Sequence, residues 1–167
     1  MISEADKSMW SNLFHIGEAW EVTVATLWAV SPLFNGIPKK EILKLAKNMH
    51  PRRYETGETI FRANDMGAGA ALILKGKVEI RSGDITLATL GPGNYFGEIS
   101  LVLDERRTAD AIAVESSELA FFLRLDLEEW IAKAPHHGAK LSTNLAHVLA
   151  QRLLHANLML ARSVEQP

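Results

Sequence analysis

Short runs of β-branched and apolar residues, divided by glycines, occupy the middle of the chain from Arg52 to Arg124. The dividing glycines are Gly57, Gly67, Gly69, Gly76, Gly83, Gly91 and Gly93. The clearest predicted strands cover residues 71–74, 78–80, 85–90, 111–114 and 119–123. Many short strands with regularly spaced turns are typical of a small antiparallel barrel. The sequence therefore predicts a mainly β fold, an antiparallel β-roll or jelly-roll barrel with flanking helices.

Segments with helical periodicity lie on both sides of this β region. Before it, we expect a helix from about Glu4 to Val30 and a second from Pro38, as its first residue, to about Asn48. After it, a helix over residues 127–133 should follow a capping box formed by Asp126 and Glu129. A long helix is then expected from about Ala139 to Arg162.

The last predicted helix carries apolar residues along one side. These are Leu141, Leu145, Val148, Leu149, Leu153, Ala156 and Leu160. A long helix with an apolar seam that leaves a small barrel usually packs against a second helix. The sequence therefore predicts a homodimer through this helix.

Composition excludes several classes of protein. The 167 residues are 47% hydrophobic and 23% charged, as expected for one soluble domain, and the net charge of −2 argues against a protein that coats nucleic acid. There is no cysteine, and no histidine lies between Pro51 and Pro135, so the barrel strands lack the histidines of a metal-dependent cupin. The amino terminus lacks a signal pattern and no apolar stretch has membrane-spanning length, so we expect a cytoplasmic protein without membrane insertion.

Residues 95–110, YFGEISLVLDERRTAD, combine groups that suit a sugar phosphate. Gly97 lets the main chain approach a ligand closely, and Glu98 to Leu103 should form one or two helical turns whose first amides are unpaired. Arg107 can present two parallel donors to a phosphate. Glu98 can only accept hydrogen bonds, so beside an anion it suits a ligand hydroxyl.

FGEISL, followed at the right distance by RTA, resembles the phosphate-binding cassette of cyclic-nucleotide-binding domains. The resemblance continues in SPLFNGIP at 31–38, YETGETIF at 54–61, LILKGKVEI at 72–80 and GPGNYFGE at 91–98, and covers about residues 31–157. It implies that Glu98 holds the ribose 2′-hydroxyl and that Arg107 pairs with the cyclic phosphate. It also implies that the remaining cassette positions supply amides or line the site, namely Gly97, Ile99, Ser100, Thr108 and Ala109.

The same resemblance bears on the base. A threonine at position 108 resembles family members that favour cyclic GMP, although some that prefer cyclic AMP also have it, and family frequency favours cyclic AMP. NLAHVLAQRLLHAN resembles the connecting helix of regulators in the catabolite-activator class and of stand-alone bacterial sensor modules. One alignment places Arg152 and Leu153 at the base, and another places Ala156 and Asn157 there. Arg152 is preferred because a guanidinium can stack over a purine, with a surface salt bridge as an equal alternative.

The resemblance implies a non-enzymatic sensor whose regulatory ligand is cyclic AMP or cyclic GMP, with no other cofactor and no metal. Three parts are expected: an N-terminal helical extension (1–30), the cyclic-nucleotide-binding β-roll (31–135) and a C-terminal lid and dimerisation helix (136–167). Ligand binding would move that helix and signal to an unknown effector protein.

Two alternatives remain open. One is a catabolite-activator-like transcription regulator, or a fragment of one, without its helix-turn-helix. Direct DNA binding is not expected in that case, because the chain ends at Pro167 before such a domain. The other is a ligand-free interaction domain in which Glu98 and Arg107 form a structural ion pair.

Overall fold

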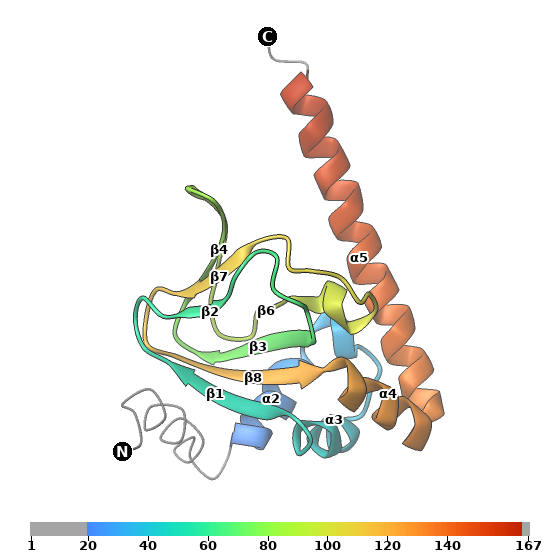
Figure 1. The fold of residues 1–167 in the computed structure, drawn as a ribbon. Helices are drawn as coiled ribbons and strands as arrows, with labels where there is room; N and C mark the ends of the chain where they lie inside the picture. The colour runs from blue at the N-terminus through green and yellow to red at the C-terminus, as the bar shows by residue number, and fades with distance from the viewer. Residues whose placement is uncertain (1–19, 165–167) are drawn as a thin grey trace, which may run out of the picture.

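The computed structural model describes residues 20–164, and Figure 1 shows two antiparallel sheets with the helices gathered on the side of one of them. The strands are β1 (His50–Tyr54), β2 (Thr59–Phe61), β3 (Gly69–Lys75), β4 (Val78–Ser82), β5 (Ile85–Leu90), β6 (Tyr95–Phe96), β7 (Asp110–Ala113) and β8 (Ser117–Leu123). They pair in the orders β1-β8-β3-β6 and β2-β7-β4-β5. Eight strands in two such sheets form a jelly roll, so the predicted fold class is confirmed.

Helices precede, interrupt and follow the strands. They are α2 (Trp20–Ala29), the 3-10 helix η1 (Pro32–Phe34), α3 (Lys39–Ala46), the 3-10 helix η2 (Glu98–Leu101), α4 (Arg124–Lys133) and α5 (Pro135–Val164). Only the end of the helix predicted from Glu4 to Val30 is seen, as α2, because residues 1–19 lie outside the described part of the chain.

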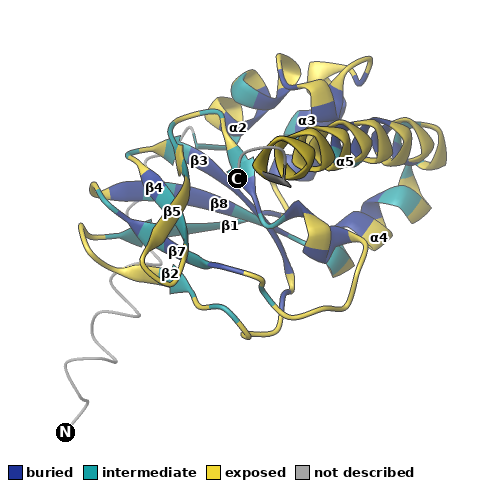
Figure 2. Cartoon of the chain, turned by 90° about the horizontal axis from the view of Figure 1, so that it is seen from above, coloured by how far each residue is buried: buried dark blue, intermediate teal, exposed yellow. Residues whose placement is uncertain are grey.

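Strand β3 contributes to two cores because both of its faces are buried. Ala70 and Leu72 pack with the helices, where the Trp28 ring stacks on Phe34 at 4.3 Å between centroids. The alternate residues, including Ile73, pack between the two sheets. Figure 2 shows β3 and β8 mostly buried and the outer end of α5 exposed. The long apolar run in β3 therefore follows from contact on both faces.

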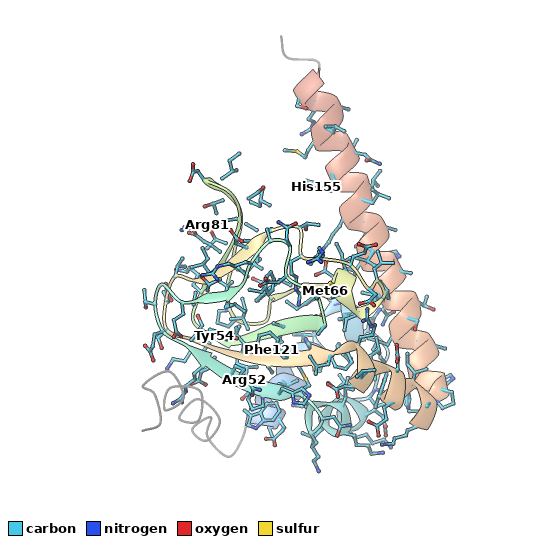
Figure 3. The ribbon with its side chains drawn as sticks, viewed as in Figure 1. Arg52, Tyr54, Met66, Arg81, Phe121 and His155 are labelled. Carbon is cyan, nitrogen blue, oxygen red and sulfur yellow. The ribbon has the colours of Figure 1, made fainter. Side chains whose placement is uncertain are left out.

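Aromatic side chains of β1 and β8 pack at the edge of the core between the sheets. Figure 3 labels Tyr54 on β1 and Phe121 on β8, which are neighbouring strands. The centroids of the two aromatic rings lie 6.4 Å apart. Both rings pack against the core between the sheets. β1 is an edge strand, which explains how it can contain Pro51, a residue without an amide donor.

Several helix boundaries differ from the prediction. Pro38 is the extended cap of α3 rather than its first residue. The capping box with Asp126 at the helix cap is wrong, because α4 begins at Arg124 and Asp126 lies in its first turn. There the Asp126 carboxylate accepts the Leu123 amide at 3.2 Å. Helix α5 begins at Pro135, four residues before the predicted start, since proline needs no amide partner at a first helical position.

Helix α5 has a packed half and an exposed half. Leu141, Leu145 and Val148 are buried, and the buried Asn144 donates to the Leu33 and Asn35 carbonyls at 3.0 and 2.8 Å. Beyond them the exposed apolar residues are Leu153, Leu154, Leu158, Met159 and Leu160. The predicted continuous seam is therefore wrong, because its first half packs on the chain's own helices.

The 30 residues of α5 span about 45 Å, and Figure 1 shows the helix extending well past the roll. Within residues 20–164, every helix is too short or too polar to cross a membrane.

Candidate functional site

A pocket of about 310 Å³ lies between the cassette, the sheet that contains β4 and β5, and α5. Its walls include all seven cassette positions predicted at the site, namely Gly97, Glu98, Ile99, Ser100, Arg107, Thr108 and Ala109. Arg152 of α5 joins them. The volume lies within the range of about 300–1,000 Å³ that is usual for small-molecule sites.

Gly97 brings the cassette backbone against the guanidinium of Arg107. Its φ of 75° is left-handed, and a Cβ atom at this position would lie 2.4 Å from Arg107 Nη1. The turn that follows is the 3-10 helix η2, which forms about one turn and ends at Leu101 rather than at the predicted Leu103, and the Ser100 amide donates to the Gly97 carbonyl at 3.1 Å. The Ser100 amide is therefore used within the cassette, while Ile99 is half exposed on the pocket wall.

The guanidinium of Arg107 is held from several sides. Nη1 donates to Ser100 Oγ at 3.0 Å and to the Gly97 carbonyl at 3.3 Å, and Nη2 donates to the Gly69 carbonyl at 2.8 Å. Its Cζ lies 4.2 Å from the centroid of the Phe61 ring, a cation–π contact. Nε of Arg107 is buried and has no hydrogen-bond partner. Arg107 therefore has a fixed orientation and a donor still to be used.

Burial lowers the pKa of Arg107, while the carboxylates of Glu98 and Asp65 act to raise it. The guanidinium remains charged at neutral pH because the ordinary pKa of an arginine lies far into the alkaline range. A fixed, partly desolvated cation of this kind suits a bound anion.

Glu98 forms an ion pair with Arg152, which α5 brings to the pocket. Arg152 Nη1 donates to Glu98 Oε1, and its Cζ lies 5.4 Å from the centroid of the Tyr95 ring. The Glu98 side chain is 5% exposed and that of Arg152 is 50% exposed. The donors of Arg107 go to other groups, so the ion pair between Glu98 and Arg107 considered from the sequence is not the one that forms among the described residues.

Tyr95 completes this contact. Burial raises the pKa of the Tyr95 hydroxyl, with Glu98 acting in the same direction and Arg152 against it. The half-buried ring thus lies against the guanidinium of Arg152 as a neutral phenol at physiological pH.

The two alignments of the terminal helix assign the base contact to different residues, which lie in different positions relative to the pocket. Arg152 lines the pocket, whereas Leu153 and Asn157 are exposed and lie outside its walls. Ala156 lines a neighbouring pocket of about 400 Å³, together with His155, which Figure 3 labels on α5. The base contact assigned to Arg152 or Asn157 stays a prediction.

Sequence reasoning missed the apolar wall opposite the cassette. Phe61 of β2, Ile80 of β4, and Ala88 and Leu90 of β5 line the pocket. In β5 these positions alternate with exposed ones, a signal visible in the sequence once the strand's inner face is known. Arg106, next to Arg107 in the cassette, is exposed, donates to the Asn64 carbonyl at 2.7 Å and also lines the pocket.

Within residues 20–164, no three His, Cys, Asp or Glu side chains come close enough together to hold a metal ion. The polar groups of the pocket instead include a fixed cation, a buried carboxylate and a second cation from α5. Such a set can bind an anion that also carries hydroxyl groups.

The family model of the cyclic nucleotide-binding domain matches residues 51–134. The chain belongs to the cyclic nucleotide-binding domain family. The match covers the β-roll and the cassette, together with α4. The predicted family is thus confirmed.

Two relatives resemble the chain over most of its length. It is 38% identical over 135 residues to the cyclic AMP receptor protein of Thermus thermophilus, a match that covers 78% of this chain and 61% of the relative. It is 32% identical over 134 residues to a CRP-like cAMP-activated global transcriptional regulator of Mycobacterium tuberculosis, covering 77% and 58%. The chain thus spans about three fifths of the length of these relatives.

The structure also resembles solved members of the family. The crystal structure of the Thermus thermophilus catabolite activator protein superposes with a TM-score of 0.72 at 37% identity, covering 80% of this chain and 63% of that one. This likeness agrees with the jelly-roll order of the strands.

Proposed function

We propose that the chain is a non-enzymatic sensor that binds one cyclic mononucleotide in the cassette pocket. The phosphate bonds to Arg107 through Nε and the free side of Nη2, and the ribose 2′-hydroxyl bonds to Glu98. The observation that carries the proposal is the convergence of Glu98 and Arg107 on one pocket, where Arg107 is fixed by three hydrogen bonds and retains a buried Nε donor.

Cyclic AMP is the proposed ligand. The names of the Thermus and mycobacterial relatives refer to cyclic AMP, and the wall formed by Phe61, Ile80, Ala88 and Leu90 suits the apolar faces of a base. Thr108 lies on the pocket wall and is exposed, so its hydroxyl is available to either purine. Cyclic GMP is therefore the ligand against which cyclic AMP has to be compared.

Calorimetric titration of the purified chain tests the proposal. Cyclic AMP, cyclic GMP, linear 5′-AMP and a cyclic dinucleotide are compared at the same concentrations. We expect saturable binding at one site per chain for a cyclic mononucleotide and weaker binding of the linear nucleotide, whose dianionic phosphate does not match the single fixed guanidinium. The absence of binding by either cyclic mononucleotide would reject the sensor function.

The proposed output is α5. Asn144 and the buried leucines fix its first half to the helices of the same chain, whereas the second half exposes apolar residues that suit a second copy. A ligand changes the position of α5 only if it binds one arrangement more tightly than the other.

Leu158→Glu tests the dimer, because this side chain is 52% exposed on the outer half of α5. We expect the variant to sediment as a monomer at concentrations where the wild-type chain is a dimer. Ser163→Glu, which adds the same charge nearby at an exposed polar position, serves as the control and should remain dimeric. A wild-type chain that is already monomeric would end the dimer proposal.

The second candidate function is the sensor part of a transcription regulator. It is favoured by the mycobacterial relative, which is named as a transcriptional regulator and of which this chain covers 58%. A gel-shift assay with and without cyclic AMP distinguishes the two candidates. Sequence-specific and salt-dependent retention of DNA by this chain would support the second, whereas ligand binding without DNA retention would support the sensor alone.

A further inference from the structure

We infer that Arg152 balances the charge of the pocket, so that an anionic ligand can bind beside the buried carboxylate of Glu98. The inference rests on the proposed function and concerns how the same site tolerates two negative groups. It gives α5 a defined electrostatic task in ligand binding, distinct from contact with the base.

Five charged residues line the pocket: Glu98, Glu105, Arg106, Arg107 and Arg152. Glu105 and Arg106 are exposed neighbours of opposite sign, so they largely cancel each other and are screened by solvent. The remaining charges are one carboxylate, whose side chain is 5% exposed, and two guanidinium groups. With all three ionised, the inner pocket carries one net positive charge, equal and opposite to a cyclic phosphate.

Arg107 alone cannot provide this balance. It carries a single positive charge, three hydrogen bonds of its Nη atoms already go to Gly69, Gly97 and Ser100, and the ion pair of Glu98 is made with Arg152. Without Arg152, the charges of Glu98 and Arg107 would cancel, and an incoming phosphate would leave one uncompensated negative charge in a largely desolvated site. Such a charge is costly to bury and repels the ligand.

The geometry allows Arg152 and the ligand to share Glu98. Arg152 Nη1 donates to Oε1, and a carboxylate accepts hydrogen bonds at both oxygens, so a ligand hydroxyl can bond to Glu98 while Arg152 stays in place. The contact of Arg152 with the Tyr95 ring supports the same position of the guanidinium. Arg152 is therefore a positioning and charge-balancing residue for the carboxylate.

Arg152 lies one turn beyond Val148, the last buried residue of α5. The charge balance consequently depends on α5 lying close enough to the roll for Arg152 to reach Glu98. Because coupling between two binding events is reciprocal, anything that holds α5 in this place raises ligand affinity, and the ligand in turn favours this place.

A double-mutant cycle measured by calorimetry with cyclic AMP tests the inference. Arg152→Met keeps an unbranched side chain of similar length without charge, and Arg152→Lys keeps the charge. We expect Arg152→Met to weaken binding by roughly tenfold or more, because the Glu98 carboxylate, deprived of its ion pair, then opposes an incoming anion; the loss stays below the unscreened value because the site of Arg152 is half exposed to solvent. Arg152→Lys should bind nearly as tightly as the wild-type chain.

The decisive comparison repeats Arg152→Met in the Glu98→Gln background, where no carboxylate needs compensation. There the loss caused by Arg152→Met should largely disappear. An equal loss in both backgrounds would show that Arg152 acts on the ligand itself and would overturn the inference. Tighter binding of cyclic AMP by Arg152→Met would also overturn it, because that result would show that Arg152 and the ligand compete for Glu98. If the wild-type chain binds no cyclic nucleotide, the proposed function fails first, whereas binding with an additive cycle rejects the charge balance alone.

Discussion

Gly97→Ala tests the close approach between the cassette backbone and Arg107. The new Cβ would lie 2.4 Å from Arg107 Nη1 and 3.3 Å from Cζ, whereas ordinary contact begins at 3.4 Å, so the guanidinium must shift by about 1 Å. The shift moves the Arg107 donors away from the position in which they would bond to a phosphate. The loss of one charge-assisted hydrogen bond is worth about 1.5–3 kcal/mol, or about 10- to 150-fold in affinity for cyclic AMP.

Backbone strain adds a separate effect on stability. An alanine at the φ of 75° found at Gly97 costs about 1–2 kcal/mol in the free energy of unfolding. Gly57→Ala is the matched control, since Gly57 has a φ of 90° but nothing lies within 4 Å of its would-be Cβ. Urea unfolding should show a loss of stability in both variants, and calorimetry should show weakened binding in Gly97→Ala alone. Wild-type affinity in Gly97→Ala would refute the reasoning.

Two further changes test the ribose assignment and the attachment of α5. Glu98→Gln should weaken the binding of cyclic AMP more than that of its 2′-deoxy analogue in parallel titrations, because only the former offers a hydroxyl to the carboxylate; equal losses for both would remove the assignment. Asn144→Ala should lower the free energy of unfolding by about 1–3 kcal/mol, since two backbone carbonyls lose their donor. Thr143→Ala, at an exposed neighbouring position, is its control, and equal stability of the two variants would contradict this role of Asn144.

The cassette could be predicted from the sequence because its residues are close together in the chain. Gly97, Glu98 and Arg107 lie within eleven consecutive positions, so local spacing was sufficient to place them in one site. The glycine-divided strands were likewise visible, because turns that need a positive φ mark the chain at Gly57, Gly76 and Gly83.

Contacts between distant segments could not be predicted in the same way. Glu98 and Arg152 are 54 positions apart, and their pairing depends on the angle at which α5 crosses the roll. The apolar residues of α5 read as one seam, because periodicity does not reveal where packing on the same chain ends and exposure begins. The apolar wall was missed for a related reason, since alternation in β5 identifies two faces without showing which of them faces the pocket.

The most direct test of the sensor function is calorimetric titration of cyclic AMP into the wild-type chain, Arg107→Ala and Arg106→Ala. Arg106 is the matched control, being an exposed arginine on the pocket wall next to the partly buried Arg107. Removing Arg107 should cost about 2–5 kcal/mol, the range for breaking a buried charge-assisted pair, which corresponds to a loss of affinity of about 30-fold to several thousand-fold. Arg106→Ala should bind nearly as the wild type does. Unchanged affinity in Arg107→Ala would contradict the account.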